Sequence, residues 1–167
     1  MVGGWRALPV IAIVSLISPL TACSSKSSPA VGEAFAARAT AVCQRALASK
    51  HAWSPFPVAS FDPAHPDPSV FPKAAVWLED QVAPTFEAWL HGLRALGLPP
   101  KARKVWTDVL AAVAGIVQGN AGEIAAAKAG DTKGFVAARN RLIETETELV
   151  QATAAAGVPT CADVTKE

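Results

Sequence analysis

The stretch PKAAVWLEDQVAPTFEAWLHGLRAL, residues 72–96, has the clearest apolar periodicity in the chain. Its large apolar side chains recur every three or four residues, which is the spacing of one face of an α-helix. This repeat comprises Leu78, Val82, Phe86, Trp89, Leu90, Leu93 and Leu96. The opposite side carries Asp80, Glu87, His91 and Arg94. We therefore predict an amphipathic helix over about 72–96, bent at Pro84 because proline has no backbone N–H to donate.

The same spacing predicts a helix on the N-terminal side of this stretch and two more after it. The first helix covers about 31–49 and places on one side Phe35, Ala39, Val42, Cys43 and Ala46. The third covers about 100–129 and is expected to bury Val105, Trp106, Val109, Val113, Ile116, Val117 and Ile124. The fourth follows an Asp131 cap and runs to about residue 156. Its broad apolar face contains Phe135, Val136, Leu142, Ile143, Leu149 and Val150.

Short connections join the last three helices. Glycine and proline at 97–100 end the second helix and begin the third, and Gly130 ends the third. Short connections make consecutive helices antiparallel neighbours. The 35 alanines and the absence of tyrosine also suit closely packed helices. The expected fold class is all-α: an up-down four-helix bundle with a long Pro- and aromatic-rich loop between helices 1 and 2.

The connection between the first two helices, residues 51–71, is unusual. It contains Trp53, Phe56 and Phe61 among five prolines, and this proline density excludes a regular helix or a central strand. Long loops of this kind are commonly functional or disordered. Three interpretations stay open: the aromatic residues cover the bundle as a lid, they border a groove for an apolar or aromatic partner, or the loop is disordered.

The same loop contains Asp62, His65 and Asp67. Carboxylates and imidazole can bind Zn²⁺, but prolines at 63, 66 and 68 favour extended backbone that separates these side chains. We therefore expect solvated turn residues and no metal site.

Three polar residues interrupt the apolar faces of the last two helices. Arg139 and Glu146 project from the middle of the fourth helix's apolar face, and Asn120 lies in the stripe of the third. A buried charge requires a partner. Glu146 is accordingly expected to form an interior network with Arg139 or Asn120. Two alternatives stay open: Arg139 and Glu146 reach the rim or form a structural ion pair, or these residues line a polar ligand pocket.

The N-terminus has the organisation of an export signal. A weakly positive start is followed by an apolar run over 7–20 and small residues at 21 and 22. The run is too short for a membrane-spanning helix. Leu20-Thr21-Ala22-Cys23 resembles the lipobox of bacterial prolipoproteins. The resemblance implies that the Cys23 thiol is lipidated with fatty-acyl chains such as palmitate and that residues 1–22 are removed; an ordinary secretory signal is the alternative.

Cys43 and Cys161 are the cysteines that remain once Cys23 is assigned to lipid. An even pair in an exported chain is most simply a disulfide. The bridge is compatible with the bundle, because extended residues 157–161 can return to the end at which the first helix begins.

Cleavage would leave 145 residues, in which 14 basic side chains balance 14 acidic ones. We expect a lipidated cysteine and polar tether at 23–30 and one helical domain at 31–167. A neutral chain without a basic cluster argues against nucleic-acid binding. Because no G-x-S-x-G, H-E-x-x-H or glycine-rich phosphate loop is present, we expect no enzymatic activity and no cofactor.

The domain also resembles, loosely, small alanine-rich envelope lipoproteins and secreted helical proteins of actinobacteria. Cys43 and the ending Gly157-Val158-Pro159-Thr160-Cys161 carry this resemblance, which implies no particular activity. The sequence thus predicts a protein anchored by lipid to the extracytoplasmic face of the cell membrane. It is expected to be a binding or accessory module for a hydrophobic ligand or an envelope protein; the alternative is a structural or interaction protein with a fully packed core and no ligand pocket.

Overall fold

The structure is a computed structural model that describes residues 29–58 and 61–166. Within these residues all regular secondary structure is helical. The expected signal segment, Cys23 and the tether up to residue 28 lie outside the described residues.

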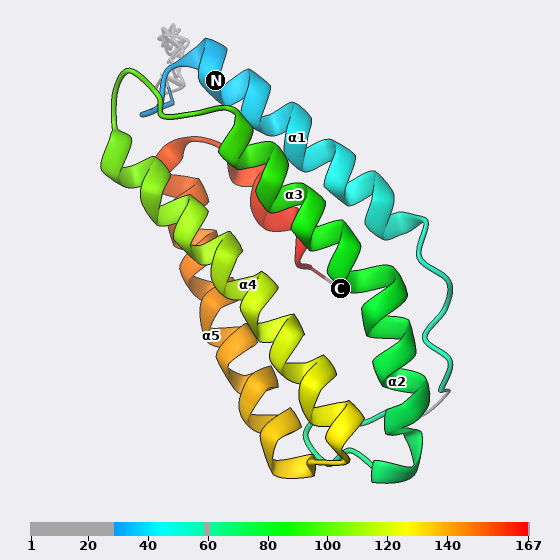
Figure 1. Ribbon diagram of the computed structural model, residues 1–167. Coiled ribbons are helices and arrows are strands. Elements are labelled where there is room, and N and C mark those ends of the chain that lie inside the picture. The colour runs from blue at the N-terminus through cyan, green and yellow to red at the C-terminus, as the bar shows by residue number, and fades with distance from the viewer. Residues whose placement is uncertain (1–28, 59–60, 167) are drawn as a thin grey trace, which may run out of the picture.

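Four long helical segments lie where the apolar spacing predicts them (Figure 1). The first is α1, Glu33–His51. The second is one continuous run that contains α2, Phe71–Trp77, a π-helical turn η2, Leu78–Val82, and α3, Ala83–Ala95. The third and fourth are α4, Arg103–Ala129, and α5, Thr132–Ala156.

Pro84 changes the second segment through the π-helical turn that precedes it. A proline ring clashes with the carbonyl four residues earlier and has no N–H for it. The chain accommodates this by winding more widely, so that the Ala83 N–H donates to the Leu78 carbonyl five residues back. The Thr85 hydroxyl donates to the Gln81 carbonyl at 2.9 Å, in the turn that contains the proline.

The turns at the helix ends agree in part with the predictions. The Asp131 cap is confirmed, because its side chain accepts the Gly134 N–H at 2.9 Å. Gly130 ends α4 in the left-handed conformation, with φ of 66°. The prediction that the third helix begins at about residue 100 is wrong, since α4 starts at Arg103 after Ala102, which has φ of 54°.

The long segments enclose the core together with a short C-terminal helix. α3 packs against α1 and α4, and α4 packs against α5. The 3₁₀-helix η3, Pro159–Val164, contacts both α1 and α5 (Figure 1). The expected extended return over 157–161 is therefore helical in its second half. Gly157 permits the turn into it, because its φ is 77° and a Cβ there would lie 2.6 Å from the Pro29 Cα.

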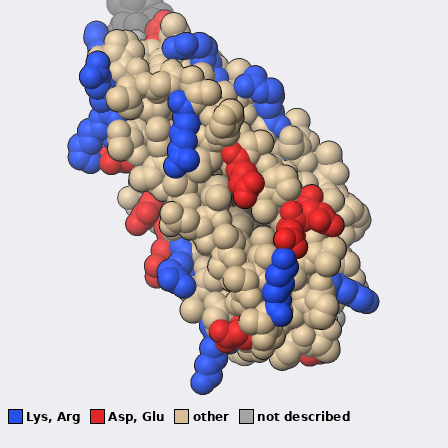
Figure 2. All heavy atoms as spheres, in the orientation of Figure 1, with Lys and Arg blue, Asp and Glu red and all other residues tan. Residues whose placement is uncertain are grey.

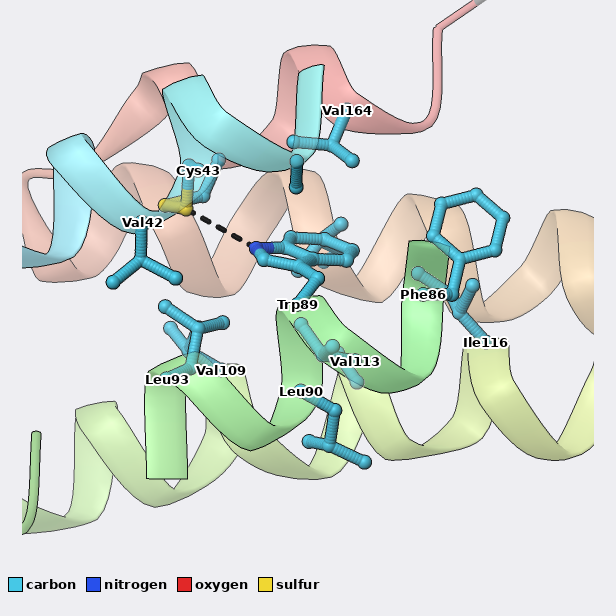
Figure 3. Close-up of a cluster of buried hydrophobic side chains, with 14 of the residues drawn as sticks. Val42, Cys43, Phe86, Trp89, Leu90, Leu93, Val109, Val113, Ile116 and Val164 are labelled. Atoms are coloured by element: carbon cyan, nitrogen blue, oxygen red, sulfur yellow. Dashed lines mark hydrogen bonds between the residues drawn. A yellow bond between two sulfur atoms is a disulfide. The ribbon is translucent and has the colours of Figure 1, made fainter. Parts of the chain in front are cut away.

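Trp89 of α3 lies at the centre of the core and is 1% exposed. Figure 3 shows it between Cys43 of α1, Val164 of η3 and Val113 of α4. Its indole N–H donates to the Cys43 sulfur at 3.3 Å. The predicted disulfide is confirmed: Cys43 and Cys161 are joined with an S–S distance of 2.01 Å, so the bridge links α1 to η3 through the buried core.

The breadth of the apolar face predicted for the fourth helix is wrong. Phe135, Leu142 and Leu149 are buried, whereas Ile143 is 50% and Val150 48% exposed. The buried half faces α4, where glycines allow close approach: a Cβ on Gly119 would lie 2.8 Å from Leu142, and one on Gly115 would lie 2.7 Å from Thr145. In the third helix Val105, Val117 and Ile124, expected to be buried, are half-buried against the core.

Candidate functional site

A groove with a volume of about 470 Å³ runs between the second helical segment and α4. We call it the α3–α4 groove. Its apolar lining consists of Ala83, Pro84, Phe86, Val117, Ala121, Ile124 and Ala125. Its polar lining consists of Glu79, Glu87, Asn120 and Lys128. Small side chains on α4 and the widened turn before Pro84 flank this hollow, whose volume lies in the range of clefts that hold small molecules.

Asn120 is the deepest polar residue of the α3–α4 groove. It is 3% exposed, and its side-chain amide donates to the Ile116 carbonyl at 2.9 Å. The charged residues lie at the exposed margin. Lys128 pairs with Glu79 at 2.7 Å across the groove, whereas no described Lys or Arg pairs with Glu87.

A second group of polar residues lies between α4 and α5. We call Glu123, Arg139 and Glu146 the polar cluster. Glu123 follows Asn120 by three residues, is 2% exposed, and lies 3.9 Å from the Arg139 guanidinium. Its Oε1 accepts no hydrogen bond from the described residues.

The environment of Glu123 disfavours its charged form. Burial raises the pKa of the Glu123 carboxyl to about 7; the positive charge of Arg139 opposes this shift, and the negative charge of Glu146 adds to it. Glu123 and Glu146 therefore lie near enough to repel. A buried carboxyl in this state exchanges a proton close to neutral pH.

The structure places Arg139 and Glu146 near Glu123, a residue that the sequence analysis did not single out. Arg139 forms an ion pair with Glu123. Asn120 was expected in the same network, but its side-chain amide donates to the Ile116 carbonyl of its own helix. The signal for Glu123 was present: it continues the stripe of Val113, Ile116 and Asn120, with spacings of three and four residues. The contact between Glu146 and Arg139 stays a prediction.

The aromatic residues of the loop pack onto the helices. Trp53 contacts Trp77 and Phe86 edge to face, with ring centroids 5.5 and 5.8 Å apart, and its indole N–H donates to the Thr85 hydroxyl at 3.0 Å. Phe56 lies 5.1 Å from the Trp77 ring in a similar arrangement. The loop thus covers α2 and the start of α3.

Phe61 extends the same packing to the fourth helix. Its ring lies 5.0 Å from Phe56 and 5.7 Å from Phe135 of α5. A smaller groove of about 420 Å³ borders the loop and is lined by Ser54, Pro57, Pro72, Lys73, Val76, Trp77, Asp80 and Gln81. The loop therefore covers the helices and also lines one edge of this smaller groove.

Asp62, His65 and Asp67 stabilise local turns. Asp62 accepts the Ala64 N–H at 2.9 Å and lies 3.1 Å from the His65 ring nitrogen. Asp67 accepts the Ser69 N–H at 2.9 Å and caps the 3₁₀-helix η1, Pro68–Val70. These bonds lower the pKa of both carboxyls. Across residues 29–58 and 61–166, no three His, Cys, Asp or Glu side chains are grouped so as to hold a metal ion.

α4 is, among the described helices, the one long and apolar enough to cross a membrane, and 39% of its most apolar window is buried inside the protein. Core helices also have this property. Figure 2 shows acidic and basic side chains scattered over the face that contains α3 and α4, with no large patch of one sign.

Comparisons with family models, with curated proteins and with solved structures found no match to this chain.

Proposed function

We propose that this protein is a non-enzymatic binding module of the cell envelope, anchored by lipid at Cys23, and that the α3–α4 groove holds a small apolar ligand. The single observation that carries the binding proposal is the groove itself: about 470 Å³, mostly apolar walls, and a buried amide at its base. Ligand sites of this kind combine apolar walls with a few polar groups that orient the ligand.

The groove sits in an architecture that we propose to be an up-down four-helix bundle, with α2, η2 and α3 counted as one helix. The contacts of α3 with α1 and α4, and of α4 with α5, support this arrangement. The η3 segment would then complete the side between α1 and α5, leaving the α3–α4 groove on the outer surface.

Anchoring is tested by Cys23→Ala, with Ser24→Ala as the matched control. We expect Cys23→Ala to lose metabolic fatty-acid labelling and membrane retention, because the acylated thiol is gone and stable anchoring needs its chains. Unchanged labelling of Cys23→Ala would contradict the assignment.

Ligand binding is tested on the full chain in phosphatidylcholine nanodiscs, with empty nanodiscs as the reference. The probe is 4-phenyl-1-butanol, and its affinity is measured by saturation-transfer NMR titration. Ala121→Trp places an indole in the groove, whereas Ala111→Trp places one on an exposed position of α4 outside it. We expect Ala121→Trp to abolish binding and Ala111→Trp to preserve it; equal binding to both variants would contradict the proposal.

The alternative is an interaction protein that binds no small ligand. One observation favours it: Ile143 and Val150 lie seven residues apart on the outer side of α5, and both are about half exposed. Ile143→Ser/Val150→Ser should then abolish association with an envelope protein, and Ala121→Trp should have no effect on it.

A further inference from the structure

The charges at the rim of the α3–α4 groove do not balance. Two carboxylates, Glu79 and Glu87, and one ammonium, Lys128, line the groove. Lys128 forms its ion pair with Glu79, at 2.7 Å. Glu87 is exposed and has no Lys or Arg partner among the described residues, so the groove presents one uncompensated negative charge.

Glu87 lies close to the apolar part of the lining in sequence and in space. It follows Phe86 and lies one helical turn after Ala83 and Pro84, and all four residues line the groove. An occupant that contacts these apolar side chains therefore has an acidic group within reach at the solvent edge. The buried Asn120 amide supplies a hydrogen-bonding group at the base.

We infer that the α3–α4 groove selects ligands that combine an apolar or aromatic body with a cationic amine, and that Glu87 is the residue that recognises the amine. This inference rests on the proposed function and specifies the ligand class. The apolar body would replace water along the groove, and the ammonium would pair with Glu87 at the rim, where both charges stay partly hydrated. Anionic ligands of the same shape would be repelled.

The size of the effect follows from the exposure of Glu87. Exposed ion pairs contribute modestly, so we expect an amine to bind about threefold more tightly than a neutral ligand of the same shape. Because the pair is at the surface, this preference should weaken as ionic strength rises.

The test compares 4-phenylbutylamine, 4-phenyl-1-butanol and 4-phenylbutyrate on the full chain in phosphatidylcholine nanodiscs, by the same NMR titration. An alkylamine is protonated at pH 7, since its pKa resembles that of lysine, about 10.4. We expect the amine to bind most tightly and the carboxylate least. Glu87→Gln should reduce the amine-to-alcohol affinity ratio to about one. Glu148→Gln, an equal charge change at an exposed site outside the groove, should leave the ratio unchanged.

A ratio of one in the wild-type protein, or a preference that survives Glu87→Gln, would overturn the inference. If the alcohol binds and Ala121→Trp blocks it, while the ratio is one, the groove remains a binding site and only its cation preference is wrong. If no probe binding depends on Ala121, the proposed function fails as well.

Discussion

Glu123 is the residue at which burial and charge conflict most directly. Glu123 is 2% exposed, its ion pair with Arg139 spans 3.9 Å, and Glu146 adds a repulsive charge. Removing a partner from a buried charge usually costs more than the pair contributes, so the cluster is sensitive to single changes.

The first prediction is that stability falls as pH rises across the titration of Glu123. Its folded-state pKa, about 7, exceeds the ordinary value of 4.5, so the folded protein holds the proton more tightly than the unfolded chain. The contribution of Glu123 to the free energy of unfolding therefore decreases by up to about 3 kcal/mol between about pH 4.5 and about pH 7. Above about pH 7 this contribution is constant. Glu123→Gln should remove this slope in urea titrations at several pH values. Glu144→Gln, at an exposed position, should retain it.

The second prediction is energetic coupling between Arg139 and Glu146. We expect the double-mutant cycle of Arg139→Leu and Glu146→Leu to give a coupling energy of more than about 0.5 kcal/mol. The reason is that each single change removes the partner of a charge inside the protein. Denaturant unfolding measures the four stabilities. Additive effects within that limit would mean that the two side chains act independently.

Sequence reasoning identified two members of the polar cluster, Arg139 and Glu146, and missed Glu123, which is the most buried of the three. Glu123 continues the apolar stripe of α4, but how deeply each side of that stripe is buried depends on the packing of α4 against its neighbours. The phase of α4 is set by its contacts with α5, which depend on the glycines at 115 and 119. These tertiary contacts are not readable from the third helix alone.

At the scale of elements, the loop before α2 is stabilised by its aromatic side chains. Trp53 combines two edge-to-face contacts with a hydrogen bond to Thr85, beside the π-helical turn. Aromatic pairs of this geometry contribute beyond their buried area. The loop is therefore held on the same helical turn whose widened backbone borders the α3–α4 groove.

We predict that Trp53→Ala lowers the free energy of unfolding by about 2–3 kcal/mol, somewhat less than for a fully buried tryptophan. Trp53→Phe should cost about 1 kcal/mol, since it keeps an aromatic ring and loses the donor to Thr85. Val76→Ala, at a residue that is 57% exposed, should change stability by less than about 0.5 kcal/mol. Chemical denaturation measures all three, and equal effects of Trp53→Ala and Val76→Ala would refute the packing role.

The elements were more predictable in their interiors than at their ends. Period-3.6 patterns located the four long helical segments, because amphipathic burial is a local property of sequence. The late start of α4 depends on the left-handed Ala102, and the helical form of η3 depends on the space between α1 and α5. The groove depends on how two helices approach each other, so no single stretch of sequence indicates it.

At the scale of the whole molecule, the Cys43–Cys161 bridge links the first helix to the last element. Both cysteines are fully buried, and the Trp89 indole donates to one of the sulfurs. The cross-link spans 118 residues in sequence, so it removes much of the freedom of the unfolded chain. Stability is thereby coupled to the oxidation state of the protein.

We predict that Cys43→Ala/Cys161→Ala lowers the free energy of unfolding by about 2–5 kcal/mol. Reduction of the unfolded wild-type protein should have a similar effect on its refolded stability, whereas the double variant should not respond to reductant. Denaturant titrations with and without dithiothreitol provide the comparison. A double variant as stable as the oxidised protein would show that the bridge contributes nothing.

The bridge also determines how the protein responds to tension. A pull applied between the two chain ends passes from the N-terminal side to Cys43, across the sulfurs to Cys161, and out through the last residues. The intervening residues 44–160 form a closed covalent loop that carries no load, and the α3–α4 groove lies wholly within it. Stretching can therefore extend the covalent chain only outside this loop, and the residues that line the groove are not on the path of the load.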